Sequence, residues 1–146
     1  MDIRLDQVNI VVRDMDAMSA FYTRLGLRLN KGAPEWSPHH RNTGSLDGID
    51  VDLDSPEFAS AWNEGWPGGT GVVLGFRLPD RDAVDLMYAE LIADGHESQQ
   101  QPYDAFWGSR YAVVADPDGN SVGLMSPRDE ARRKPSPAPP PARPVS

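Results

Sequence analysis

Polar residues that alternate with apolar ones could bring reactive groups to one face of a sheet. The stretch IDVDLD places aspartates at residues 50, 52 and 54, each preceded by an aliphatic residue. Because strand side chains alternate between faces, the three carboxylates should share one face. LDQVNIVV adds the amide groups of Gln7 and Asn9. Such a face could bind a cation or an amine, or it could simply be solvated.

Aromatic residues form the second candidate feature. The chain has four tryptophans, which lie outside the periodic strands and the two main helices. The tryptophans, and two aromatic residues close to the last of them in the sequence, occur in loops and linkers. The set is Trp36, Trp62, Trp66, Tyr103, Phe106 and Trp107. Ligand contacts concentrate in such segments, and flat rings around an apolar cup suit a planar aromatic ligand. Each ring could instead cover the core or anchor a subunit interface.

We therefore predict a ligand-binding site that combines these rings with polar side chains. Because adjacent strand residues point to opposite faces, at most one of His39 and His40 should enter it, although such a pair is also typical of a polar loop. Acidic groups beside aromatic rings favour a small aromatic ligand, including a cationic one. The polar members of the predicted site are Gln7, Asn9, His39, Asp50, Asp52 and Arg110.

The elements that must position these residues occur twice. A strand at LDQVNIVV precedes the helix DMDAMSAFYTRLG, and a strand at residues 72–78 precedes the helix RDAVDLMYAELIADG. A short strand at residues 27–30, a turn at SLDG and the strand IDVDLD complete the first half. Apolar positions of the two helices match at an offset of 66 residues. This repeat predicts an α+β fold of two paired βαβββ modules, with a curved mixed sheet around a cavity.

Composition sets the boundaries of the chain's organisation. We predict one domain over residues 1–126, with modules at about 1–66 and 71–126. The segment 127–146 holds seven of the 14 prolines and almost no large apolar residue, so a disordered tail is expected. The tail could also be a ligand for a proline-binding module. Because we assign it no part in the cavity, deleting it is expected to leave ligand binding unaffected.

Charge and cysteine content exclude several classes of function. The net charge is −8, and no residue is a cysteine, so thiolate catalysis and disulfides are excluded. Nucleic acid is a poor partner for this acidic chain. No apolar run is long enough to span a bilayer, and MDIRLDQ does not resemble a secretory signal. We expect a cytoplasmic protein with no membrane partner.

The chain resembles the vicinal oxygen chelate superfamily, which includes glyoxalase I, extradiol dioxygenases, fosfomycin-modifying enzymes and bleomycin-resistance proteins. The resemblance covers residues 3–126 and rests on DQVNIVVRDMDAMSAFYTRLGL and YDAFWGSRYAVVADPDGNSVGLMSP. In metal-dependent members, ligands come from four inward positions. These positions correspond here to Gln7, Asp52, Val72 or Val73, and Gly123. Valine and glycine side chains cannot bind a metal, so we expect neither a metal ion nor another cofactor.

The resemblance then favours binding over catalysis. We expect a metal-free protein of the bleomycin-resistance type, which would sequester an aromatic natural product or antibiotic. In that group the sites form between two chains, so the resemblance also implies a homodimer. The alternative is a glyoxalase or dioxygenase-type enzyme of the same superfamily, with Gln7, Asp52 and atypical metal ligands.

Overall fold

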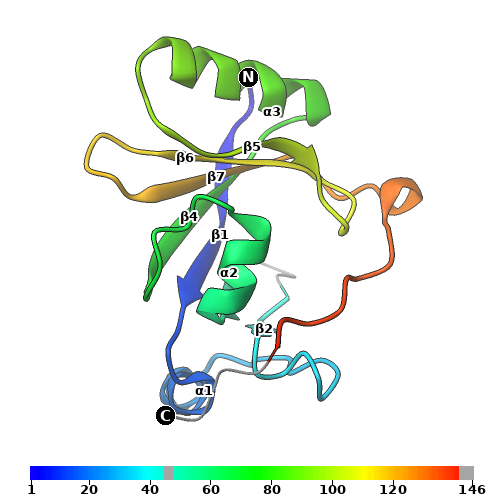
Figure 1. Ribbon diagram of the computed structural model, residues 1–146. Coiled ribbons are helices and arrows are strands. Elements are labelled where there is room, and N and C mark those ends of the chain that lie inside the picture. Colours follow the sequence, from blue (N-terminus) through cyan, green and yellow to red (C-terminus); the bar gives the residue numbers. More distant parts are fainter. Residues whose placement is uncertain (45–47, 142–146) are drawn as a thin grey trace.

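The chain folds around one mixed sheet with three α-helices, seen in a computed structural model that describes residues 1–44 and 48–141 (Figure 1). Most of the turn predicted at SLDG lies outside the described residues. The strand order is β2-β3-β1-β4-β7-β6-β5. The elements are β1 (Arg4–Val11), α1 (Met15–Arg24), β2 (His40–Asn42), β3 (Asp50–Asp54), α2 (Pro56–Trp62), β4 (Gly71–Arg77), α3 (Arg81–Ala93), β5 (Ser98–Asp104), β6 (Arg110–Ala115), β7 (Ser121–Met125) and the 3₁₀ turn η1 (Glu130–Arg132).

The two predicted modules lie side by side in this sheet. β1 pairs in parallel with β3, and β4 pairs in parallel with β7, while β1 and β4 pair antiparallel and join the modules. The α+β fold of paired modules is therefore confirmed. Module one departs from the pattern at residues 27–30. There the expected strand is reduced to a single bridge between Asn30 and Asn42.

Both module helices begin at aspartate caps and cover the same face of the sheet. Asp14 accepts from the backbone N–H of Ala17, and Asp80 begins α3 in the same way. Helical spacing in α1 predicts a buried stripe of Met18, Phe21, Tyr22 and Leu25, and only Met18 and Tyr22 of these pack on the sheet. Phe21 is 59% exposed and Leu25, just beyond the last helical residue, is 70% exposed. Met15, Met18 and Tyr22, spaced by three and seven residues, pack on the sheet instead.

The opposite face of the sheet carries the aromatic core. α2 packs there, and its Phe58 and Trp62 join Val73 of β4 and Tyr111 of β6 in one cluster. Ser55 caps α2 and Pro56 opens it. Because α2 lies across only part of this face, the remainder can be lined by polar residues of β1, β2 and β3.

The C-terminal segment lies along the molecule as far as residue 141. The backbone N–H of Asp129 donates to the carbonyl of Gly108 over 3.1 Å, and that of Lys134 donates to Phe106 over 2.9 Å. Beyond η1 the segment descends toward α1 (Figure 1). Composition predicts disorder for residues 127–146, whereas Asp129 and Lys134 are hydrogen-bonded to the loop at residues 106–108. None of the helices in the described ranges is long and apolar enough to cross a membrane.

Candidate functional site

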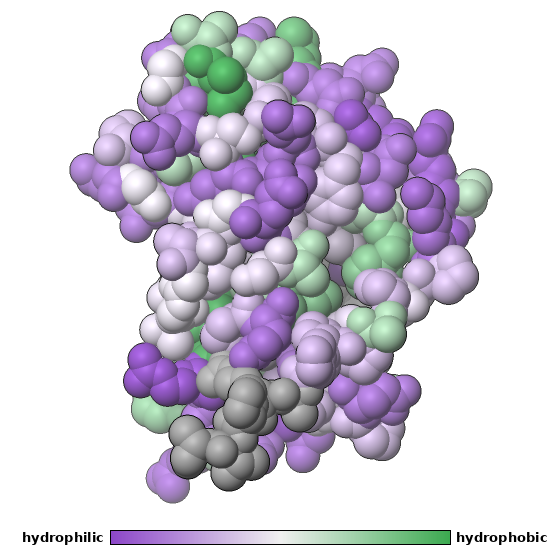
Figure 2. Space-filling view, viewed as in Figure 1, coloured by the Kyte–Doolittle hydropathy of each residue, from purple (hydrophilic) through white to green (hydrophobic). Residues whose placement is uncertain are grey.

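A cavity of about 480 Å³ opens on the sheet face that carries α2. In Figure 2, apolar side chains drawn in green lie in the hollow at the centre right, among hydrophilic residues drawn in purple. The lining comes from both modules and from the C-terminal segment: Gln7, Asn9, Asn30, Gly32, Ala33, Trp36, His40, Asn42, Asp52, Asp54, Phe58, Trp62, Phe106, Trp107, Tyr111, Met125, Arg128, Arg133 and Ser136.

The polar floor of the cavity is assembled by strand register. Asn9 of β1 lies opposite Asp52 of β3, which lies opposite Asn42 of β2. Residues opposite one another on neighbouring strands point to the same face. The Gln7 amide then donates to Asn9 Oδ1 over 2.8 Å and to Asp52 Oδ2 over 3.2 Å. Asn9 Nδ2 donates to Asp54 Oδ2 over 2.8 Å, which is a second side-chain hydrogen bond between β1 and β3.

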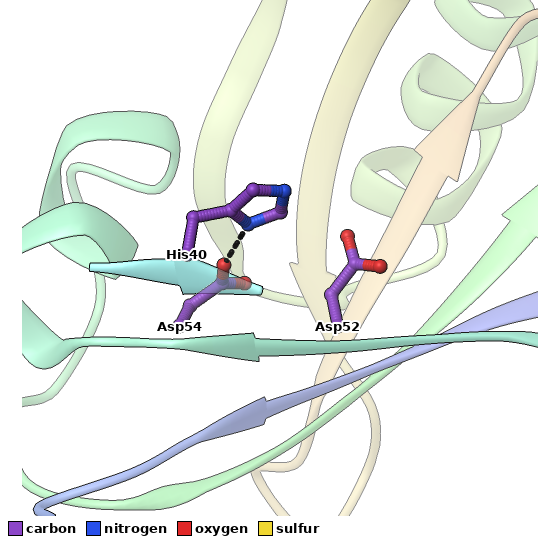
Figure 3. A group of neighbouring side chains, drawn as sticks. All are labelled: His40, Asp52 and Asp54. Carbon is purple, nitrogen blue, oxygen red and sulfur yellow. Dashed lines mark hydrogen bonds and ion pairs between the residues drawn. The ribbon is translucent and has the colours of Figure 1, made fainter. Parts of the chain in front are cut away.

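His40 extends this floor from β2 toward the mouth of the cavity. Its Nδ1 lies 2.6 Å from Asp54 Oδ1 (Figure 3). Asn42 Nδ2 lies 3.2 Å from the His40 Nε2. Because an amide N–H can only donate, Nε2 accepts and Nδ1 carries the hydrogen that Asp54 receives. Asp54 itself is fully buried.

Asp52 is the least satisfied group of the floor. Its side chain is 5% exposed, and Oδ1 is buried with no hydrogen-bond partner among the described residues. Burial raises the pKa of Asp52 well above its usual range, and the neighbouring carboxylates of Asp54 and Asp50 raise it further. The floor of the cavity therefore holds a buried carboxyl group with one oxygen, Oδ1, to which no N–H or O–H of the described residues donates.

Aromatic rings form walls beside this floor. The Trp36 and Phe58 ring centroids lie 5.1 Å apart in an edge-to-face arrangement. The Trp107 ring lies 5.4 Å from that of Tyr111, and the Trp62 ring lies 6.1 Å from the same tyrosine. Aromatic pairs of this geometry are stable and hold the rings in place. A planar aromatic group could be received between such walls.

The cavity brings together many of the residues predicted to bind ligand, from two strands, one helix and two loops. Its lining includes Gln7, Asn9, Trp36, Asp52, Trp62, Phe106 and Trp107. The other predicted residues lie outside the lining: His39, Asp50, Trp66, Tyr103 and Arg110. Each of these has a structural contact that explains its position.

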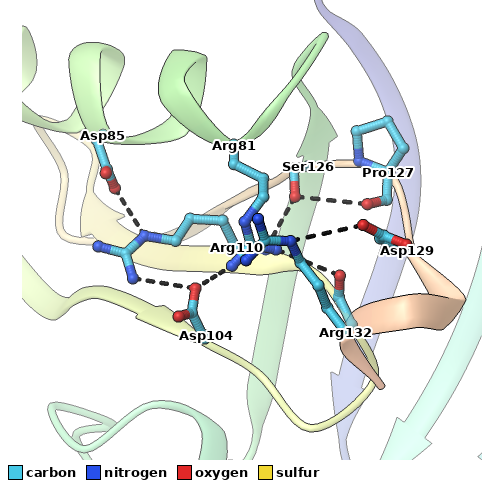
Figure 4. A network of polar contacts seen from close by, with 9 residues as sticks. Arg81, Asp85, Asp104, Arg110, Ser126, Pro127, Asp129 and Arg132 are labelled. Atoms are coloured by element: carbon cyan, nitrogen blue, oxygen red, sulfur yellow. Dashed lines mark hydrogen bonds and ion pairs between the residues drawn. The ribbon is translucent and has the colours of Figure 1, made fainter.

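Three of the outlying polar residues are turned away by strand parity or by local contacts. His39 is buried and its Nδ1 lies 2.7 Å from the Ser55 hydroxyl, so the histidine that enters the cavity is His40. Asp50 accepts hydrogen bonds from the turn that precedes β3. Arg110 lies on the face covered by α3, where it pairs with Asp85 and Asp104 (Figure 4).

The remaining two aromatic residues support the wall from outside. The Tyr103 hydroxyl donates to the carbonyl of Trp62 over 3.1 Å, and its ring contacts Tyr111 at 6.1 Å. Burial raises the pKa of Tyr103 far above its usual range, so its hydroxyl stays protonated. Trp66 donates to Gly69 within the linker between the modules.

Several lining residues are not among the predicted ones. Asp54 follows from the alternation that already picks out Asp52, and His40 follows from strand parity once β2 is known to begin there. Phe58 and Tyr111 carry no sequence signal beyond their apolar character. Arg128 and Arg133 come from the segment that composition assigns to a disordered tail.

The four family positions for metal ligands do not gather four donors here. Gln7 and Asp52 face the cavity, whereas Val73 is a buried core residue and Val72 lies on the other face, 51% exposed. At Gly123, an added Cβ atom would lie 2.9 Å from the Tyr111 hydroxyl. These residues do not fit the family's metal centre.

A different set of metal-binding groups does lie close together in the cavity. One potential ligand atom each from His40, Asp52 and Asp54 falls within 4.8 Å of the others. Two of these side chains are engaged with one another through the bond between His40 Nδ1 and Asp54 Oδ1. A metal bound through Nδ1 would have to displace that bond.

Comparisons with known proteins agree with the fold. A structure from Vibrio splendidus, described as a glyoxalase/bleomycin resistance protein/dioxygenase superfamily member, is 19% identical over 86% of this chain and all of its own, with a TM-score of 0.58. Methylmalonyl-CoA epimerase from Mycobacterium tuberculosis is 22% identical, with 87% of this chain and 89% of the epimerase covered and a TM-score of 0.55.

A third structure, the Mn(II)-bound glyoxalase from Novosphingobium aromaticivorans, is 20% identical over 84% of this chain, with a TM-score of 0.58. This chain spans 38% of that glyoxalase. A search of curated proteins found no match. The family profile described as Glyoxalase/Bleomycin resistance protein/Dioxygenase superfamily matches residues 4–124. The chain therefore belongs to the glyoxalase/bleomycin resistance protein/dioxygenase superfamily.

Proposed function

We propose that this protein binds an aromatic small molecule in its cavity without a metal and without changing the molecule covalently. Binding would lower the free concentration of the ligand, as expected for sequestration of an aromatic natural product or antibiotic. Resistance to such a compound would then depend on affinity and on the amount of protein.

One observation carries this proposal: the place of the family's fourth metal ligand is taken up by an aromatic wall. Tyr111 occupies the space beside Gly123, and it packs against both Trp62 and Trp107. The same ring thus removes room for a ligand side chain and extends the surface for a flat molecule. A cavity of about 480 Å³ is within the usual size of small-molecule sites.

A metal-dependent enzyme of the superfamily is the second candidate. It is favoured by His40, Asp52 and Asp54, whose potential ligand atoms lie within 4.8 Å of one another. This candidate predicts a stoichiometric divalent ion in protein purified without chelator, and loss of that ion when His40 is replaced.

The experiment that tests the proposal is tryptophan fluorescence quenching against a panel of aromatic antibiotics. Trp107 lines the cavity, whereas Trp66 does not, so Trp107→Phe and Trp66→Phe form a matched pair. We expect saturable quenching that Trp107→Phe reduces and Trp66→Phe leaves in place. Mass spectrometry of the released ligand should find it unchanged. No saturable quenching by any compound, or an altered ligand, would contradict the proposal.

We also propose a homodimer in the cytoplasm, following the binding proteins that the chain resembles. Light scattering coupled to size-exclusion chromatography would test the dimer. A mass close to twice 16.0 kDa is expected. A monomer at micromolar concentration would contradict this part of the proposal alone.

A further inference from the structure

The hydrogen bonds of the cavity floor are nearly complete without any ligand. One carboxylate oxygen of Asp54 accepts a hydrogen bond from Asn9 over 2.8 Å, and the other accepts one from His40 over 2.6 Å. Both ring nitrogens of His40 are engaged, one with Asp54 and one with Asn42. The Gln7 amide donates hydrogen bonds to both Asn9 and Asp52. The described part of the floor therefore has few polar atoms left to bind a ligand.

Asp52 Oδ1 is the exception. Asp52 lines the cavity and is 5% exposed as a residue, and no N–H or O–H of the described residues donates to its Oδ1. The Asp50 carboxyl lies within hydrogen-bonding reach of the Asp52 carboxyl, and Asp52 Oδ2 accepts from Gln7. Buried polar atoms are nearly always paired, and an unpaired one in a cavity points to a missing donor. What the floor lacks is a single hydrogen-bond donor, and positive charge would suit it best.

We propose that Asp52 Oδ1 receives the protonated amine of an aromatic ligand whose rings lie between the Trp36 and Trp107 walls. This inference rests on the proposed function and names the ligand class: an aromatic amine that is cationic at neutral pH. The ammonium group supplies the missing donor and neutralises the buried carboxylate. Aromatic walls add to the attraction, because a cation near a ring face is stabilised.

The pattern of hydrogen bonds favours an amine over a divalent metal ion. A metal held by His40, Asp52 and Asp54 would need several ligand atoms at once, and the His40–Asp54 bond already uses two of them. An ammonium needs only one acceptor and leaves that bond intact. A charge-assisted hydrogen bond to one carboxylate oxygen is a sufficient anchor.

Several charged and titratable groups surround the proposed amine site. The charged and titratable groups around Asp52 are Asp50 and Asp54 on its own strand, His40 on β2, Tyr111 on β6 and Arg128 in the C-terminal segment.

The test uses two probes of nearly equal size, naphthylmethylamine and the neutral naphthylmethanol. Isothermal titration calorimetry measures both against the wild-type chain, Asp52→Asn and Asp118→Asn. The last variant makes the same change of charge at an exposed hairpin residue. We expect the wild type and Asp118→Asn to prefer the amine by about tenfold or more, and Asp52→Asn to lose that preference while binding the alcohol as before.

Each outcome separates the inference from the proposed function. If the alcohol binds and the amine binds no better, or if Asp52→Asn keeps the preference, the inference fails and the proposed function stands. If neither probe binds at millimolar concentration, both fail for ligands of this size. If Mn²⁺ or Zn²⁺ binds stoichiometrically and excludes the amine, the site is a metal site.

Discussion

The hydroxyl of Tyr111 occupies the space that a side chain at Gly123 would need. A Cβ atom added to Gly123 would lie 2.9 Å from this hydroxyl and 3.2 Å from Cε1 of the ring. The strands carrying the two residues are adjacent, and both residues lie on the cavity face. Glycine at residue 123 and the aromatic wall are thus parts of a single arrangement.

Gly123→Ala should therefore destabilise the protein. The added methyl group must displace a buried tyrosine, and overpacking of a core typically costs about 1–3 kcal/mol. Urea unfolding would measure the loss. Combining the change with Tyr111→Phe removes the closest atom and should restore part of the stability, as a double-mutant cycle would show. Equal losses with and without the hydroxyl would contradict the packing described.

Asp52→Asn should become more stabilising, relative to the wild type, as pH increases. The pKa of Asp52 is higher in the folded than in the unfolded protein. The contribution of Asp52 to the free energy of unfolding is therefore fully present below the unfolded pKa and is lost as pH rises through the folded pKa. The neutral amide avoids that loss. Unfolding curves between pH 4 and pH 8 would check this. Asp118→Asn is the control at an exposed residue. A difference in free energy of unfolding between Asp52→Asn and the wild type that narrows at high pH would contradict the burial argument.

His40→Ala should destabilise the folded protein more than a surface histidine does. Removing the ring leaves Oδ1 of Asp54, which is fully buried, without its donor. An unsatisfied buried group costs about 1–3 kcal/mol. His96→Ala is the control, with an expected change within about 0.5 kcal/mol. Equal midpoints of thermal unfolding for the two variants would contradict this prediction, because water would then replace the His40 ring without loss of stability.

Arg128→Gln should strengthen the binding of naphthylmethylamine and leave that of naphthylmethanol unchanged. Arg128 lines the cavity and its charge lowers the pKa of Asp52, so it opposes an incoming cation. We expect a gain of about two- to threefold for an exposed, screened charge. Arg132→Gln, which removes the same charge outside this cavity, should have a smaller effect. Weaker amine binding in Arg128→Gln would show that the arginine helps to hold the ligand.

The same contacts change the expectation for the C-terminal segment. Composition alone predicts that deleting residues 127–146 leaves ligand binding unaffected. Because Arg128, Arg133 and Ser136 line the cavity, the deletion should instead alter amine affinity. Calorimetry on a chain ending at residue 126 would decide between the two expectations.

Local patterns in the sequence were sufficient to predict the fold. The repeat of the two helices lies where the spacing indicates, and DPDGN forms the hairpin between β6 and β7. In that hairpin, Asp116 accepts from the backbone of Asp118 and Asn120, and Gly119 has a φ of +90°. These features depend on residues close in the chain, so the sequence carries them directly.

The site was harder to predict, because it depends on pairing between distant strands. Alternation places Asp52 correctly, but whether His39 or His40 enters the cavity depends on where β2 begins. Arg110 is polar and lies near aromatic residues, yet its strand position points it toward α3. Proline content likewise says nothing of the backbone contacts that hold Asp129 and Lys134 against a loop.

The central claim is that the cavity binds an aromatic ligand without a metal. The most direct measurement is a tryptophan quenching titration, with the antibiotic that quenches best, before and after exhaustive treatment with chelator. The metal content of both samples is determined alongside. We predict the same saturable, one-to-one quenching in both samples and the ligand recovered unchanged. Quenching that disappears with the chelator and returns with a divalent ion would contradict the claim.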